Sequence, residues 1–160
     1  MVKNKHIDIL VIGSGPGGYA AAFRAADLGR KVMLVDKDPT LGGVCLNRGC
    51  IPSKTLLHIA KVLEEAESLK KMGVTFSKPK IDIDSVRDWK NKVVSQLSNG
   101  IGQMAKARKV ETVQAEATFL SDTEVQLKID TKKETITFDH CIIAAGSSSS
   151  VIPGIPFENE

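Results

Sequence analysis

Residues 13–18 read Gly-Ser-Gly-Pro-Gly-Gly, and this glycine-rich turn decides how the chain around it folds. The residues before it, Ile7 to Ile12, are almost all apolar, which is typical of a strand buried on both faces of a parallel sheet. The residues after it, Tyr19 to Leu28, are rich in alanine, and Gly29 is well placed to end a helix there. The sequence therefore predicts a strand, a tight turn and a helix in direct succession.

An acidic residue completes this pattern. A second strand is predicted from Lys31 to Val35, and Asp36 follows it, 18 residues past Gly18. In dinucleotide-binding units the glycines allow a tight turn and close backbone approach, the helix N-terminus faces a pyrophosphate, and the acid accepts a ribose hydroxyl. The glycine motif alone is weak evidence, but here strand, turn, helix, strand and acid occur in order. The sequence therefore predicts a dinucleotide site that includes Gly13, Gly15, Gly18 and Asp36.

Two cysteines, Cys45 and Cys50, lie just downstream in a chain with only one other cysteine. Two interpretations are open: inert, buried thiols that pack like small apolar side chains, or a redox pair. On an ideal helix, residues five apart are separated by about 7.5 Å of rise and about 140° of rotation, whereas a disulfide needs Cα atoms about 5.5 to 6 Å apart. A disulfide therefore requires a distorted helix, which Gly49 and Pro52 would permit. Arg48 and a helix N-terminus would favour a thiolate.

The remaining sequence changes from helical to strand periodicity. Apolar residues at spacings of three and four predict a helix from about Pro52 to Lys71 and another from an N-cap at Asp84 to about Lys106. Residues 140–146 predict a second buried parallel strand, into which residues 135–138 continue. Alternating segments that predict strands of a small antiparallel unit are residues 110–115, 124–129 and 135–138. The predicted fold class is α/β: a Rossmann-like, three-layer domain with a parallel sheet plus a small antiparallel β unit.

Composition limits the functions open to this chain. At 160 residues it has the size of one domain, with 42% hydrophobic and 26% charged residues. A net charge of +3 and 4% aromatic residues argue against nucleic-acid binding, and no apolar run approaches the roughly 20 residues of a membrane span. With no signal peptide we expect a cytoplasmic protein, in which a close cysteine pair is more often catalytic or metal-binding than structural. Zinc is disfavoured because no second cysteine or histidine pair has ligand spacing.

Four segments together resemble the flavin-dependent pyridine nucleotide-disulfide oxidoreductases, and most closely the bacterial dihydrolipoyl dehydrogenases. The segments are residues 13–18, 42–47, 49–54 and 142–147. The most specific pattern among them is Cys-Leu-Asn-x-Gly-Cys-Ile-Pro-Ser-Lys, although glutathione and mercuric reductases carry close variants. The resemblance spans nearly the whole chain, and it implies an FAD-binding protein with a redox disulfide.

The resemblance also implies a role for each residue of the site. FAD would lie along the turn after the first strand, with its adenosine ribose on Asp36. Cys45 would exchange with the lipoyl sulfur, and Cys50 would face the flavin and pass electrons to it. Lys54 would lie near the reactive edge of the flavin, and Ala117 would contact the adenine through its backbone. The other implied cofactor contacts are Gly42, Gly43, Ala145 and Gly146.

The sequence departs from that family at two positions that bear on this site. Asp36 stands where the family usually has glutamate, and a shorter acid can still accept the ribose hydroxyls. Arg48 replaces a small apolar residue, which would alter the acidity of the neighbouring thiols. The third cysteine, Cys141, falls inside a predicted strand and is expected to be inert.

The resemblance implies that residues 1–150 form the FAD-binding domain and that residues 151–160 lead toward an NAD-binding domain absent from this sequence, so that the chain alone would be inactive. The complete enzyme would be a homodimer that oxidises dihydrolipoamide on the lipoyl domain of 2-oxoacid dehydrogenase complexes and passes electrons to FAD and then NAD. Two alternatives are open: a related reductase of the glutathione or mercuric type, and a non-catalytic nucleotide-binding module with inert cysteines.

Overall fold

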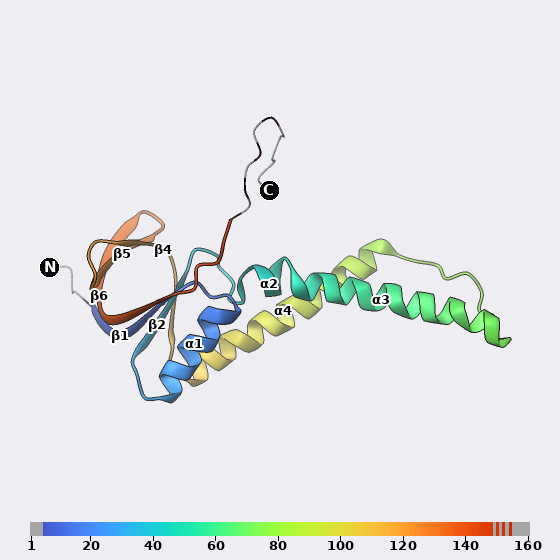
Figure 1. The fold of residues 1–160 in the computed structure, drawn as a ribbon, viewed down its shortest axis with the longest axis horizontal. Helices are drawn as coiled ribbons and strands as arrows, with labels where there is room; N and C mark the ends of the chain where they lie inside the picture. The colour runs from blue at the N-terminus through green and yellow to red at the C-terminus, as the bar shows by residue number, and fades with distance from the viewer. Residues whose placement is uncertain (1–4, 149, 151, 153, 155–160) are drawn as a thin grey trace.

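A six-stranded sheet forms one end of the protein (Figure 1), seen here in a computed structural model that describes residues 5–148, 150, 152 and 154. The strands follow the order β3-β2-β1-β6-β5-β4 across the sheet. They are β1 (Lys5–Ile12), β2 (Val32–Asp36), β3 (Glu111–Gln114), β4 (Glu116–Phe119), β5 (Glu124–Ile129) and β6 (Lys132–Ile143). Most of the predicted linker, residues 151, 153 and 155–160, lies outside the described residues.

One half of the sheet is parallel. β1 pairs with β2 and β6, and β2 pairs with β3, all in parallel. This confirms the two N-terminal strands and the parallel strand near residue 140. The prediction that residues 110–115 belong to the antiparallel unit is wrong, because β3 lies in parallel beside β2. Several helices connect these two strands, and a helical crossover brings the chain back in the parallel direction.

The other half of the sheet is antiparallel, as β5 pairs with both β4 and β6 in that direction. β6 belongs to both halves, because its first part pairs with β5 and most of its length pairs with β1. It is therefore one continuous strand, as the predicted continuation of residues 135–138 into the second parallel strand requires. β4 was not predicted as a separate strand, and its four residues are too few to display a clear alternation.

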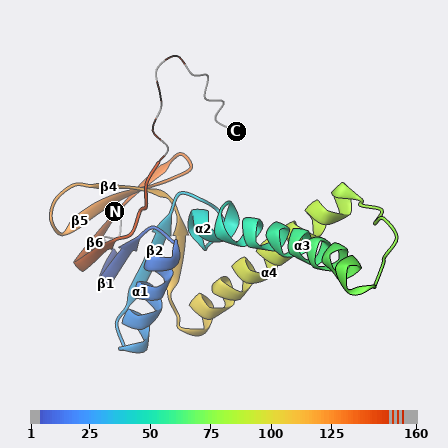
Figure 2. The same ribbon diagram turned by 45° about the vertical axis from the view of Figure 1, so that its right-hand side comes forward.

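Each face of the parallel strands is covered by a different layer (Figure 1; Figure 2). Helices α1 (Pro16–Asp27) and α4 (Ile83–Ala107) pack on one face. The buried residues there include Val11, Ala22, Phe23, Leu34, Leu46, Ile101 and Ala105. The antiparallel strands contribute to a second cluster with Leu10, Met33, Val35, Ala115, Val125, Leu127, Ile136 and Phe138. The three-layer α/β class is confirmed.

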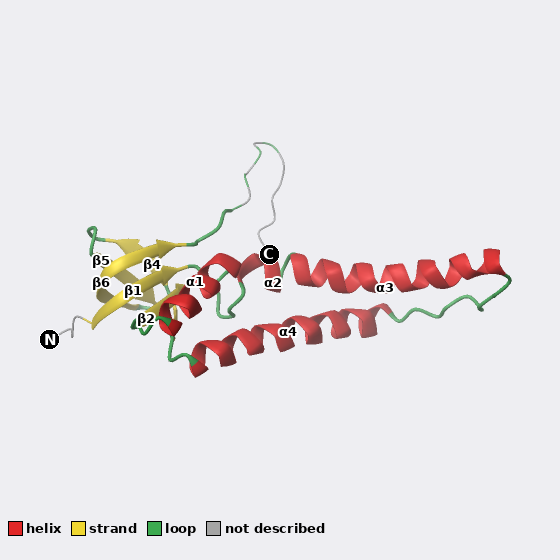
Figure 3. Ribbon diagram, turned by 60° about the horizontal axis from the view of Figure 1, so that its bottom comes forward, coloured by secondary structure: helices red, strands yellow, loops and turns green. Residues whose placement is uncertain are grey.

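The chain between β2 and β3 builds a helical arm that extends away from the sheet (Figure 3). It contains α2 (Gly43–Asn47), α3 (Cys50–Ser68), a 3-10 turn (Leu69–Met72) and α4. The two long helices confirm the predicted ones, but none of the residues of α3 is buried. The part of the arm that positions the site is therefore its base, where α2 and the start of α3 meet the sheet.

The N-cap of α4 is Asp82 and not the predicted Asp84. The Asp82 carboxylate accepts hydrogen bonds from the backbone N–H groups of Asp84 and Ser85, at 3.1 and 3.2 Å. An N-cap lies one residue before the first helical residue, which here is Ile83. Asp84 lies in the first turn, where its carboxylate pairs with Arg87.

The last part of β6 is more exposed than predicted. Ile142 and Ile143 are 37% and 68% exposed, although an apolar run had indicated a buried strand. Apolar side chains make a strand suited to burial, but burial also requires a neighbouring element. No described residues cover the side chains of Ile142 and Ile143. None of the helices among the described residues is long and apolar enough to cross a membrane.

Candidate functional site

The glycine turn after β1 is packed tightly on its inner side. Gly13 has a φ of +101°, and a Cβ atom there would lie 2.2 Å from the carbonyl oxygen of Ala144. A Cβ atom on Gly18 would lie 1.7 Å from the carbonyl oxygen of Gly13. Both glycines are therefore required by the fold, because they let α1 and the segment after β6 approach the turn.

The outer side of the same turn is open. A Cβ atom on Gly15 or Gly17 would have no heavy atom within 4 Å beyond its chain neighbours. α1 begins at this point, with Pro16 in its first turn and no side chain capping its N-terminus. Backbone N–H groups at an uncapped helix N-terminus attract anions such as phosphate. The turn therefore combines an inner side that holds the fold with an outer side suited to a phosphorylated ligand.

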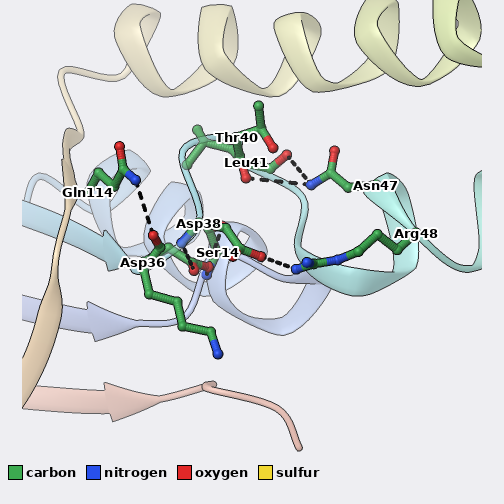
Figure 4. A network of polar contacts seen from close by, with 9 residues as sticks. Ser14, Asp36, Asp38, Thr40, Leu41, Asn47, Arg48 and Gln114 are labelled. Carbon is green, nitrogen blue, oxygen red and sulfur yellow. Dashed lines mark hydrogen bonds and ion pairs between the residues drawn. The ribbon is translucent and has the colours of Figure 1, made fainter. Parts of the chain in front are cut away.

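Asp36, at the end of β2, is held against this turn by several hydrogen bonds (Figure 4). Its Oδ2 accepts from both the backbone N–H and the hydroxyl of Ser14, each at 2.6 Å, and its Oδ1 accepts from the backbone N–H of Asp38 at 2.9 Å. Burial raises the pKa of Asp36, but these bonds and one from the Lys37 backbone outweigh it, so the pKa lies below its ordinary value of 3.8. Asp36 is therefore a preorganised acceptor, ionised at neutral pH.

The lowered pKa predicts a specific acid response. An unfolded Asp36 has its ordinary pKa, so ionisation stabilises the folded chain above pH 3.8, and this stabilisation is lost as the pH falls through the lower folded-state pKa. We expect Asp36→Asn to flatten the decline of unfolding free energy below about pH 4. Urea titrations from pH 6 to pH 2.5 measure this. Asp88→Asn, at an exposed position of α4, is the control and should decline as the wild type does. Equal declines for Asp36→Asn and wild type would contradict the prediction.

The cysteine segment is attached to the glycine turn through two further glycines. The backbone N–H of Gly42 donates to the carbonyl of Ser14 at 3.0 Å. A Cβ atom on Gly43 would lie 2.7 Å from the Cα atom of Gly15, and both Gly42 and Gly43 have a positive φ. Because these backbones touch, α2 starts directly beside the open turn.

Cys45 and Cys50 form a disulfide with a Cα–Cα distance of 4.8 Å. The helix is interrupted between them, since α2 ends at Asn47 and α3 begins at Cys50. This confirms the predicted distortion, and the two sulfurs are bonded to each other. Gly49 provides part of the break, with a ψ of −100° and a position from which a Cβ atom would lie 3.2 Å from a backbone oxygen. Pro52 lies inside the first turn of α3 and not in the break.

Arg48 occupies the break, but its guanidinium pairs with the Asp38 carboxylate (Figure 4). The expectation that its charge acts on the thiols therefore needs revision: in the disulfide form a carboxylate takes up this charge. The adjacent Asn47 side chain donates to the carbonyl of Leu41 at 3.3 Å. The turn between the cysteines is thus joined by polar contacts to the loop that follows Asp36.

The other predicted contacts lie on separate elements. Ala145 and Gly146 follow β6 beside the glycine turn, where the Cα of Ala145 would lie 2.9 Å from a Cβ on Gly13. Lys54 is an exposed residue of α3 that lines a cleft of about 290 Å³ between α3 and α4. Ala117 is a half-buried residue of β4. The contacts of these residues with a cofactor stay predictions.

Sequence reasoning missed Ser14 and Asp38. Ser14 is fully buried, and both of its donors are used by Asp36. A hydroxyl residue between two glycines, followed by an acid at the end of the next strand, is the signal that could have found it. Asp38 carries no such signal, because its partner Arg48 is recognisable only once the loop and α2 have been placed.

One further group of polar side chains lies away from the turn. His6, Asp8 and Asp139 place potential metal-ligand atoms within 4.8 Å of one another. Each already has a partner: His6 pairs with Asp139 at 3.2 Å, and Asp8 accepts from the backbone N–H of Lys31 at 2.8 Å. We assign no role to this group.

Comparison with known proteins identifies the relatives of this chain. It is 51% identical over 160 residues to a dihydrolipoyl dehydrogenase of Haemophilus influenzae and 48% identical over 159 residues to one of Vibrio cholerae, in each case covering 99% of this chain and 34% of the relative. It is 44% identical to a dihydrolipoyl dehydrogenase of Bacillus subtilis, over 94% of this chain and 32% of the relative. The chain spans about a third of the length of these curated relatives.

A family model described as pyridine nucleotide-disulphide oxidoreductase matches residues 7–160. The match includes the glycine turn, the disulfide and the segment after β6, which the structure brings together at one edge of the sheet. On this evidence, the chain belongs to the pyridine nucleotide-disulphide oxidoreductase family.

Proposed function

We propose that this chain is the FAD-binding, disulfide-bearing portion of a dihydrolipoyl dehydrogenase. The observation that carries the proposal is the backbone contact between Gly43 and Gly15, which places the start of the Cys45 helix beside a turn suited to a dinucleotide. A disulfide that only stabilised the fold would not need this neighbour. The names of the relatives support the choice of substrate, a protein-bound dihydrolipoamide.

The residues present fit an FAD molecule. Gly15 and Gly17 leave open space where a pyrophosphate would approach, and the uncapped start of α1 offers backbone N–H groups to it. Asp36 would accept the ribose hydroxyls, and Ala145 and Gly146 would border the cofactor. Lys54 and Ala117 would contact the flavin and the adenine. When bound, FAD would accept two electrons from the cysteine pair and pass them to NAD.

The cysteine pair would carry out a thiol–disulfide exchange. A thiolate of the dihydrolipoamide attacks the Sγ of Cys45, the bond to Cys50 breaks, and Cys50 leaves as a thiolate. The second substrate thiol loses its proton, attacks the substrate sulfur joined to Cys45, and releases the Cys45 thiolate. The substrate leaves as a disulfide, and its two electrons stay on the two cysteines. Both cysteines are half-buried, which leaves them partly accessible to a substrate.

The activity of a complete protein is part of the same proposal. Residues 1–150 would be the FAD-binding domain, and residues 151–160 would lead toward an NAD-binding domain. The partner would be the lipoyl domain of a 2-oxoacid dehydrogenase complex, and the complete protein would be a cytoplasmic homodimer.

The visible absorption spectrum tests this proposal. We expect the chain to retain a flavin band after FAD is added and the sample desalted, and partial reduction by a dithiol to produce a long-wavelength band from a cysteine thiolate beside the flavin. Gly15→Ala is the matched variant, because a Cβ atom there would meet no heavy atom of the described residues within 4 Å. We expect it to fold and to bind FAD at least about tenfold more weakly, since it blocks the close backbone approach. Equal FAD binding by both chains, or none by the wild type, would contradict the proposal.

A further inference from the structure

Arg48 lies in the turn between the two cysteines and points toward the loop after β2 (Figure 4). It caps the C-terminus of α2, three residues after Cys45 and two before Cys50. Its guanidinium pairs with the carboxylate of Asp38, whose side chain is only 25% exposed, whereas that of Arg48 is 59% exposed. The more exposed partner of this ion pair is therefore the one that adjoins the cysteines.

Asp38 is itself held in place by the nucleotide-binding acid. Its backbone N–H donates to Oδ1 of Asp36, and Oδ2 of Asp36 is in turn held by the two donors of Ser14. The Asn47 side chain joins the same loop through the carbonyl of Leu41. The ion pair thus extends a continuous set of polar contacts from the glycine turn to the turn between the cysteines.

The chemistry of a cysteine pair depends on charges of this kind. A cation next to a cysteine stabilises the thiolate, and so the reduced form, whenever the pH is high enough for the thiol to ionise. A cation that is paired with a carboxylate has less effect, because the negative charge offsets it. The strength of the pair between Asp38 and Arg48 therefore determines how much positive charge the reduced cysteines experience.

We propose that Asp38 and Arg48 set the redox equilibrium of the Cys45–Cys50 disulfide. The Asp38 carboxylate offsets the charge of Arg48 in the turn between the cysteines and so keeps the disulfide harder to reduce. Both act through the cysteines and are positioning residues. The inference relies on the proposed function only for the statement that the pair carries electrons. The equilibrium itself is measured on the 160-residue chain without FAD, so it can fail or succeed independently of FAD binding.

The test is a double-mutant cycle with Asp38→Asn, Arg48→Gln and the two combined. Each chain is equilibrated with reduced and oxidised dithiothreitol, and the reduced fraction is counted by alkylation and mass spectrometry. In this exchange the S–S bond of the protein breaks, two electrons pass from the reagent to the cysteines, and the reagent closes into its own cyclic disulfide. The two thiol protons of the reagent go to the cysteine sulfurs at low pH and partly to the solvent at pH 9, where the cysteines ionise.

We expect Asp38→Asn to shift the equilibrium toward the dithiol by up to about tenfold at pH 9, which corresponds to about 30 mV. The shift should be small at pH 6.5, where thiols with an ordinary pKa of about 8.5 are protonated in every chain. Arg48→Gln and the double variant should show no such shift, because they lack the cation. Charged side chains common to all four chains on neighbouring elements are Asp36, Lys37, Lys54, His58 and Lys92.

Three further variants serve as controls. Arg48→Lys keeps a cation that can pair with Asp38 and should resemble the wild type. Asp38→Ser should reproduce Asp38→Asn, which guards against an effect particular to asparagine. Asp84→Asn breaks a comparable exposed ion pair with Arg87 on α4 and should leave the equilibrium unchanged. An Asp38→Asn chain that matches the wild type at pH 9, or a shift that persists without Arg48, would overturn the proposal.

Discussion

Gly18→Ala is expected to lower the free energy of unfolding by about 3 kcal/mol or more, a large part of the stability of a domain of this size. Gly18 lies in the first turn of α1, and a Cβ atom there would lie 1.7 Å from the carbonyl oxygen of Gly13. The obstructing atom belongs to the backbone and cannot rotate away. Either α1 must move off the sheet or the turn must change shape, and both would disturb the burial of Ala22 and Phe23.

Gly17→Ala is the matched control, because Gly17 precedes Gly18 in the same helix. A Cβ atom at Gly17 would meet nothing within 4 Å, and alanine favours a helix over glycine by up to about 1 kcal/mol. We therefore expect Gly17→Ala to leave stability unchanged or to raise it slightly. Urea denaturation of the two variants and the wild type measures the difference. Similar midpoints for both variants would show that close packing of α1 against the turn does not determine stability.

Cys45→Ser and Cys50→Ser are each expected to abolish reversible thiol–disulfide cycling. The oxidised wild type should expose no fast-reacting thiol, and treatment with a dithiol should release two. Each serine variant should show one fast-reacting thiol in both states. Each variant should lose about 2 kcal/mol of unfolding free energy, which is less than the loss expected for Gly18→Ala, because the disulfide closes only a short loop.

Cys141→Ser is the control for that experiment. Burial raises the pKa of the Cys141 thiol, so this residue should react slowly in every chain. We expect Cys141→Ser to keep the change from no fast-reacting thiol to two. The prediction fails if either serine variant of the pair still cycles between two thiol counts, or if Cys141→Ser removes the cycling.

The features that could be predicted from the sequence depend on residues close together along the chain. One such feature is the succession of an apolar strand, a glycine turn and a helix of small residues. Gly13 and Gly18 indicate the turn, because glycine is needed wherever the backbone turns tightly or packs closely. The break between Cys45 and Cys50 is another such feature. On a regular helix, two side chains five residues apart point in diverging directions, so a bond between them requires a break. Residue types at these spacings predicted both features correctly.

Contacts between segments that are distant in the sequence could not be predicted, and they became known only from the folded chain. The parallel pairing of β3 with β2 depends on the path of the long helical arm. The alternation of apolar and polar residues within 111–114 indicates a strand but not its direction in the sheet. The bonds of Ser14 to Asp36 and of Asp38 to Arg48 join residues 22 and 10 positions apart. A side chain near a turn or loop has many possible partners, and the packed positions of the surrounding elements select one. The glycine turn and the cysteine pair could thus be recognised from local pattern, whereas the contacts of Asp36 and Arg48 emerge only from packing.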